Sequence, residues 1–278
     1  MEKFNYIKKR LNQMQGSRGT WEDHWQEILD YVMPRKADIV FTRTKGQKRT
    51  EILFDSTAIT ASNLLAASLQ GTLTSPSLQW FNIKLKNDQL NLNRNVQLWL
   101  EDCSKRMYEV FNETNFNTEV HEMYLDLVTI GTGALFVEEG NGGFEKNNIH
   151  FNTMHIAEYY IQENVSGYID TLYRKYKLSA RQAIQEFGEK NVGEKVLQAA
   201  KDKPDKEFNF IHAVEPLEDY KRALGKGATK LPFHSCHVCE EDKMTVRAGG
   251  YNEFPYLVPR WSKATGEIFG RSPSYNAL

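Results

Sequence analysis

Apolar residues recur at intervals of three and four through most of the first 130 residues, which is the spacing of amphipathic helices. In one of these segments, Thr20 and Asp23 resemble a capping box, and Pro34 ends the apolar stripe. The pattern predicts helices over residues 2–15, 20–33, 56–70, 96–111 and 116–130. In the fourth helix Cys103 falls on the apolar face, so it is interpreted as a small core residue.

From residue 134 the period shifts toward two, which indicates strands. Asn141-Gly142 is a hairpin signal, and residues 208–214 read as a further strand. Short helices are expected after a Ser179 cap and over 193–201, whereas residues 218–231 are interpreted as an exposed loop.

These patterns predict an α+β fold, with helices packed on a mainly antiparallel sheet that contains helix inserts. Residues 1–133 form the mainly helical part, and residues 134–278 form the mainly β part with short helices.

The segment 54–81 is rich in alanine, serine and other small residues. Gly71 and the Ser75-Pro76 step are expected to end its helix, and residues 80–85 then alternate as a strand would. Small side chains let another backbone approach closely. The expected packing or subunit-interface positions are Ala58, Ala61, Leu65, Ser68 and Trp80.

Four motifs in this order resemble the portal protein, or head-to-tail connecting protein, of short-tailed bacteriophages. They are DSTA with LAASLQGTLTSPS and WF, IGTGALFVEE, GYIDTLYRKYKLSARQAIQEFG, and PRW followed by GE, an aromatic residue and GRSP. The motif positions are Asp55, Ser56, Gly71, Pro76, Gly131, Gly133, Asp170, Arg174, Arg181, Gln182, Arg260, Trp261, Gly270, Arg271, Ser272 and Pro273.

The resemblance implies the amino-terminal, wing-like region of a subunit that assembles into a dodecameric ring in the virion, at one capsid vertex, after synthesis in the host cytoplasm. It also implies several partners: the terminase packaging motor, tail adaptor proteins, capsid and scaffolding proteins, and double-stranded DNA passing through the channel. Stem, clip and crown regions are expected beyond residue 278, with Ser272-Pro273 starting a helix. The chain would then be a cloned fragment or an incomplete gene product. A head-to-tail ring requires two different complementary surfaces on each subunit.

Composition excludes some function classes. Among 278 residues, 35 Lys and Arg nearly balance 36 Asp and Glu, so no bulk charge draws the chain to nucleic acid. No apolar run reaches the roughly 20 residues of a membrane span, so no membrane partner is expected. The start of the chain lacks the apolar core of a signal peptide, and three cysteines argue against a disulfide framework.

The best metal candidate is the segment 234–239, which has the two-residue cysteine spacing of a zinc knuckle. If it is a strand, His234 and Cys236 face one way while His237 and Cys239 face the other, so the four cannot close on one ion. We therefore predict no metal and no cofactor.

Other catalytic patterns are weak. Gly131-Thr132-Gly133 follows a helix, whereas a phosphate loop follows a strand, so the two glycines are interpreted as a backbone turn. Glu138 with Glu139 and the carboxylates of 240–242 could suggest a magnesium nuclease, but adjacent strand residues point to opposite faces. No catalytic residue is predicted. The alternatives left open are a metal-dependent DNA-processing enzyme and a small DNA or protein adaptor. The basic segment 35–53 could touch phosphate or could be a solvated loop.

Overall fold

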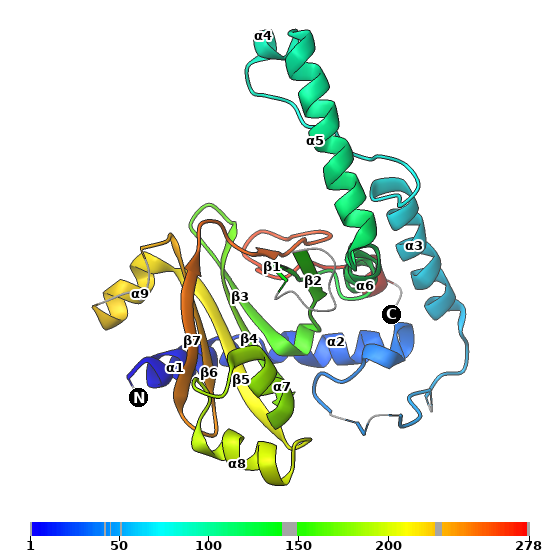
Figure 1. The fold of residues 1–278 in the computed structure, drawn as a ribbon. Coiled ribbons are helices and arrows are strands. Elements are labelled where there is room, and N and C mark those ends of the chain that lie inside the picture. Colours follow the sequence, from blue (N-terminus) through cyan, green and yellow to red (C-terminus); the bar gives the residue numbers. More distant parts are fainter. Residues whose placement is uncertain are drawn as a thin grey trace. The chain divides into compact units, whose positions relative to one another are not determined.

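A computed structural model describes residues 2–41, 43–44, 46–50, 52–140, 149–225 and 230–276 (Figure 1). The α-helices are α1 Glu2–Gly16, α2 Gly19–Val32, α3 Thr57–Leu73, α4 Asp88–Asn91, α5 Arg94–Glu113, α6 Phe116–Thr129, α7 Ala180–Phe187, α8 Glu194–Asp202 and α9 Leu217–Leu224. Three 3₁₀ turns are η1 Pro34–Lys36, η2 Ile156–Glu158 and η3 Pro273–Asn276. The strands are β1 Leu135–Glu139, β2 Ile149–Thr153, β3 Tyr159–Glu163, β4 Ile169–Ser179, β5 Glu207–Pro216, β6 Phe233–Cys239, β7 Met244–Tyr251 and β8 Tyr256–Leu257.

The α+β class predicted from sequence is confirmed, because helices precede two antiparallel sheets. One sheet has the order β2-β1-β8 and the other β3-β4-β5-β6-β7. The turn between β1 and β2, where Asn141-Gly142 was expected to form a hairpin, lies outside the described residues. Among the described residues, no helix is both long enough and apolar enough to cross a bilayer.

The chain forms two compact units that alternate along the sequence. Unit 1 contains residues 1–26, 38–42 and 155–256, and unit 2 contains residues 27–37, 43–154 and 257–278. Residue 133 therefore marks a change of secondary structure, while the compact units change elsewhere.

Unit 1 is built on the five-stranded sheet, and a cluster of buried residues covers each face of this sheet. One face carries a cluster that includes Ile7 and Leu11 of α1 with Tyr173 of β4. The opposite face packs against α7 and α8 through a second cluster that includes Phe187 and Phe210. In Figure 1, the strands β4 to β7 lie side by side, with α7 and α8 near one end of them. The alternation of β5 and β6 fills both clusters, as expected for a central strand pair.

Unit 2 centres on α6, whose residues 123–129 are all buried. Helix α3 lies beside α6, and strands β1 and β2 pair antiparallel next to it (Figure 1). An aromatic cluster closes this region, with Phe111 and Phe116 4.7 Å apart between ring centroids and Trp80 stacked on both. Trp80 remains 38% exposed despite these contacts.

The strand predicted for residues 80–85 is wrong. These residues are described and carry no strand, because they pair with side chains instead of a neighbouring strand. The Ile83 amide donates to Ser104 Oγ at 3.1 Å, and the Leu85 amide donates to Asn91 Oδ1 at 3.0 Å. Period-two alternation indicates an extended backbone, but it does not supply a partner strand.

Several helix boundaries also differ from expectation. Helix α3 continues through Gly71 to Leu73, since a single glycine within a helix costs only about 1 kcal/mol. Helix α2 starts at Gly19, before Thr20, and the Arg18 carbonyl accepts from its first-turn amides. Residues 217–224 form α9, although this stretch was interpreted as loop.

Helix α5 differs from the predicted core helix. Only Leu100 and Ser104 are buried on it, while Trp99 is 61% exposed and Met107 44% exposed. Cys103 is partly exposed, so its interpretation as a core residue is wrong. Amphipathic spacing indicates which face is apolar, but not whether the chain itself covers that face.

Candidate functional site

Two motifs about 140 residues apart meet in unit 2, and we call this contact the glycine junction (residues 129–133 with 259–274). Gly131 has a φ of +82°, in the left-handed region, so it makes the backbone turn expected from sequence. A Cβ on Gly131 would lie 2.6 Å from the Gly270 carbonyl oxygen, and a Cβ on Gly270 would lie 2.3 Å from the Gly131 oxygen. Both positions therefore require glycine for close backbone approach.

Backbone hydrogen bonds connect the two sides of the junction. The Trp261 amide donates to the Gly131 carbonyl at 2.9 Å, and the Gly133 amide donates to Pro259 O at 3.2 Å. The Gly270 amide donates to Thr132 Oγ1 at 2.8 Å, where Thr132 is fully buried. These bonds satisfy groups that would otherwise be orphaned between a helix end and a strand.

The carboxyl-terminal end of α6 is closed by serine hydroxyls. Ser272 Oγ donates to Thr129 O at 2.6 Å, and Ser274 Oγ donates to Val128 O at 3.0 Å. Both carbonyls belong to the last helical turn, which has no intrahelical donors. Ser272 Oγ also accepts from the Ser274 amide at 3.1 Å and so starts η3 Pro273–Asn276, where a helix start was expected.

Two arginines stabilise the carboxyl-terminal side of the glycine junction. Arg260 donates to the Ile268 carbonyl at 3.3 Å, and Arg271 pairs with Glu267, which lies four residues earlier. The Glu267 pairing raises the pKa of Arg271 further and lowers the pKa of Glu267. In this structure these motif residues therefore hold backbone in place.

The first motif surrounds α3. Asp55 Oδ1 accepts from the Thr57 amide at 3.1 Å and from its hydroxyl at 2.9 Å, and these bonds lower the Asp55 pKa. Ser56 is the N-cap residue, but its side chain makes no capping hydrogen bond. The Pro76 carbonyl accepts from Tyr108 Oη of α5 at 2.6 Å. A Cβ on Gly71 would meet nothing within 4 Å, so no packing within this chain requires glycine there.

The motif over 167–188 lies in unit 1. Arg174 pairs with Glu158, with Nε to Oε2 at 3.0 Å. Burial raises the Asp170 pKa, while a hydrogen bond from Thr171 opposes this effect. Ser179 and Gln182 form the complete capping box that the sequence predicts. The Arg181 side chain is exposed.

The zinc candidate, residues 234–239, lies in strand β6, so the condition for opposite-facing side chains is met. Cys236 lies in the cluster beneath α1, whereas Cys239 lies in the cluster on the opposite face of the sheet. Burial raises the pKa of both thiols to about 11, which disfavours the thiolate that metals bind. Nowhere in the described ranges do three or more His, Cys, Asp or Glu side chains gather so as to hold a metal ion.

Sequence patterns did not indicate that two histidines stack inside the same sheet. The His212 and His237 rings lie 3.8 Å apart between centroids, at 8°. Around them, His212 Nε2 is 2.9 Å from Ser235 Oγ, His212 Nδ1 is 2.6 Å from Tyr256 Oη, and Tyr176 Oη is 3.1 Å from His237 Nδ1. Burial lowers the pKa of His237 to about 3 and the pKa of His212 well below its usual value. The neutral rings act as hydrogen-bonded core.

Arg18 is a second residue that sequence reasoning passed over. Its side chain is buried and donates to Ile156 O at 2.8 Å and to the Tyr159 carbonyl. It also donates from Nε to Glu22 Oε1 at 2.7 Å, and its guanidinium lies 3.9 Å from the centroid of the Tyr160 ring. An arginine between two helices carries no local signal for its contacts with Ile156, Tyr159 and Tyr160, which lie about 140 positions away.

Replacing Arg18 with lysine is expected to lower the free energy of unfolding of unit 1 by about 2 to 3 kcal/mol. Lysine keeps the charge but loses the planar fork that reaches two carbonyls and a carboxylate together. Thermal denaturation of the 278-residue chain measures the loss. The matched change Arg181→Lys alters an exposed side chain and is expected to stay within about 0.5 kcal/mol of the parent. Equal stability of the two variants would contradict the assignment.

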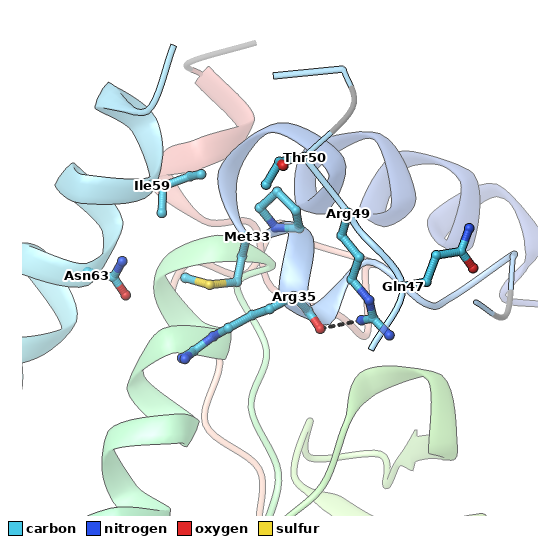
Figure 2. A pocket seen from close by; sticks show the side chains of 8 residues that line it. Met33, Arg35, Gln47, Arg49, Thr50, Ile59 and Asn63 are labelled. Atoms are coloured by element: carbon cyan, nitrogen blue, oxygen red, sulfur yellow. Dashed lines mark hydrogen bonds between the residues drawn. The ribbon is translucent and has the colours of Figure 1, made fainter. Parts of the chain in front are cut away.

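A pocket of about 300 Å³ lies in unit 2, between the end of α2, the segment 47–50 and the start of α3 (Figure 2). Met33, Pro34 and Ile59 supply its apolar lining, and Asn63 lies at the α3 side. Arg49 donates to the Arg35 carbonyl across the wall of the pocket, as Figure 2 shows.

The basic segment near this pocket is largely engaged with protein groups. Arg35 and Lys36 pair with Glu122 of α6, and Lys36 also pairs with the buried Asp126 at 2.7 Å. Arg43 pairs with Asp30 at 3.2 Å. The loop interpretation therefore fits the described part of this segment better than a phosphate site, since these cations already have carboxylate partners.

The carboxylates considered as magnesium ligands of a nuclease belong to different parts of the fold. Glu240 is an ion-pair partner of Lys8 and Lys175, and these cations lower its pKa. Glu138 lies on β1, opposite His150 of β2. Glu240 belongs to unit 1 and Glu138 to unit 2.

Residues 5–278 match the family model described as bacteriophage head to tail connecting protein. The chain belongs to this family. The resemblance inferred from its four motifs is thereby confirmed. The glycine junction and the Ser179 cap then give structural reasons for several positions of the family motifs.

Two phage proteins are similar along nearly the whole chain. A probable portal protein of Bordetella phage BPP-1 is 30% identical over 275 residues, which is 97% of this chain and 48% of that protein. The portal protein of Salmonella phage epsilon15 is 29% identical over 270 residues, which is 95% of this chain and 47% of that protein. The chain therefore spans about half the length of these two relatives.

Proposed function

We propose that this chain is the amino-terminal, wing-like part of a portal subunit that forms a ring at one capsid vertex of a phage virion. The family match over residues 5–278 carries this proposal. The ring is dodecameric and conducts double-stranded DNA during packaging and ejection. Its partners are the terminase, tail adaptor proteins, and capsid and scaffolding proteins.

The role is structural and involves no chemical step by this chain. The near balance of 35 basic and 36 acidic residues suits a conduit, because each phosphate held by a cation adds salt-dependent affinity that would slow DNA. Ion pairing of Arg35, Lys36 and Arg43 within unit 2 supports the same reading. The motif glycines and serines act as scaffold, since their contacts are with backbone.

Part of the subunit interface is the outward face of α3. Residues 56–83 contain no charged side chain, although much of α3 is exposed, including Ala58, Ala61 and Ser68. Leu65 on the same helix is half-buried, and Trp80, seven residues after the end of α3, is partly exposed. An uncharged exposed helix of small residues suits close approach by a neighbouring subunit.

Replacing Ala61 with glutamate in the complete gene product is expected to weaken assembly at least about tenfold, because the charge would be desolvated at the contact. Folding should be unaffected, since Ala61 is exposed. Sedimentation velocity measures the assembled fraction, and circular dichroism checks the fold. Asn95→Glu, at the exposed start of α5, is the matched control and should assemble normally. Normal assembly of the Ala61→Glu protein would exclude the α3 face from the interface.

A further inference from the structure

Glu215, at the end of β5 in unit 1, is a buried carboxyl that no part of the proposed function uses. It is 1% exposed and faces the cluster beneath α1. Tyr6 of α1 donates to its Oε2 at 3.0 Å, and Arg10 Nε of α1 lies 3.9 Å from the same oxygen. Two turns of α1 therefore meet the sheet at this carboxyl.

The other carboxyl oxygen lies among unsatisfied groups. Among the described residues, buried side-chain atoms without a hydrogen-bond partner include Glu215 Oε1, Arg10 Nε, Tyr173 Oη, Tyr220 Oη and His234 Nε2. The Tyr173 hydroxyl lies close enough to the Glu215 carboxyl to favour its ionised form, although the two groups fall short of full hydrogen-bond geometry. His234 is the register partner of Glu215 on β6 and stacks on Tyr220 at 3.6 Å between centroids.

We propose that Glu215 is a proton-controlled latch for α1, which is held more tightly on the sheet when the carboxyl is protonated. An ionised carboxylate with one hydrogen bond and one long ion pair remains costly in a buried site, whereas the neutral acid avoids that cost. The protonated acid also carries an O–H, which it can donate to an oxygen or nitrogen atom that lacks a hydrogen-bond partner. Release of the proton therefore favours opening of α1, which lets water reach the charge.

The charged and titratable groups around Glu215 act in both directions. Tyr6, Tyr173 and Arg10 favour the ionised form, and Asp219 from α9 favours the neutral form. Tyr6, Tyr173 from β4, Tyr220 from α9 and Cys236 from β6 all have raised pKa values, and His234 has a pKa lowered to about 4, so these stay neutral near pH 6. Burial is the largest effect on Glu215 and raises its pKa to about 6.

The sign of the pH effect follows from this raised value. The Glu215 contribution to holding α1 is fully present below the unfolded pKa near 4.5 and is lost as pH rises through about 6. A shift of this size corresponds to about a 30-fold change in the opening equilibrium. The buried histidines of the same unit act oppositely, since their neutral forms stabilise the fold at higher pH.

Hydrogen exchange of α1 amides in the 278-residue chain, corrected for intrinsic rates between pH 4.5 and 7.5, tests the latch. Relative to wild type, Glu215→Gln should protect α1 up to about 30-fold more at pH 7.5 and lose this advantage toward pH 4.5. Glu240→Gln is the matched control, because Glu240 also links α1 to the sheet through Lys8 but has a lowered pKa.

The Glu240→Gln protein should keep the wild-type pH trend between pH 5.5 and 7.5. A constant ratio of α1 protection between Glu215→Gln and wild type would overturn the proposal. NMR titration of the Glu215 carboxyl in the wild-type chain covers the case of a variant that fails to fold. A value near 6 supports the latch, and a value at or below 4.5 overturns it.

Discussion

Replacing Gly131 with alanine is expected to destabilise unit 2 by about 4 kcal/mol or more. The alanine would occupy a left-handed backbone conformation, and its Cβ would lie 2.6 Å from backbone atoms of Gly270 and Arg271. Neither neighbour is a flexible side chain that could move aside. Hydrogen exchange of α6 and β1 amides should therefore rise to the rates of a largely opened unit.

The Gly71→Ala variant is the matched control for this prediction. Gly71 lies inside α3, and its added Cβ would meet nothing within 4 Å. Alanine should stabilise that helix by up to about 1 kcal/mol. The Gly270→Ala variant should repeat the Gly131 result, since its Cβ would lie 2.3 Å from the Gly131 oxygen. Unchanged α6 protection in Gly131→Ala would contradict the glycine junction.

Lowering the pH from 6.5 to 5 is expected to cost unit 1 about 3 kcal/mol through His212 and His237. Each has a depressed pKa in the fold, so its contribution is fully present above the unfolded value of 6.5 and falls as pH drops. Between pH 6.5 and pH 5 each unfolded histidine goes from about half protonated to almost fully protonated, while the folded one stays neutral, which costs about 1.5 kcal/mol per group. Glu215 offsets about 1 kcal/mol in the opposite direction, since its raised pKa favours proton uptake on folding.

Urea denaturation of unit 1 at pH 6.5 and pH 5 measures this loss. His237→Phe removes one titrating ring while keeping the contact with Phe187, so about 1.5 kcal/mol of the net loss should disappear. Tyr176→Phe removes the hydroxyl beside His237 Nδ1 but keeps the imidazole. That variant should be less stable at both pH values with the same difference between them. A His237→Phe protein with the full acid loss would show that other groups cause it.

Structural features that depend on neighbours along the chain were predictable from the sequence. The capping box of Ser179 and Gln182 and the turn at Gly131 are local, and both were predictable from residue type and spacing. The strand alternation that separates Cys236 from Cys239 was likewise a local property.

The features that the sequence did not predict depend on contacts between segments far apart along the chain. Residues 80–85 carry no strand, and the amides of Ile83 and Leu85 bond to side chains of α5 and α4. Gly131 could be read as a turn, but the need for Gly270 opposite it is visible only when the two backbones meet. The buried contacts of Arg18 and the stacked histidines also join strands and helices that are far apart in sequence.

Electron microscopy of the complete gene product that carries this sequence tests the central claim most directly. Negatively stained, purified protein at micromolar concentration should show closed dodecameric rings, and the Ala61→Glu protein should show far fewer. A folded protein that stays monomeric or dimeric under these conditions would contradict the portal account.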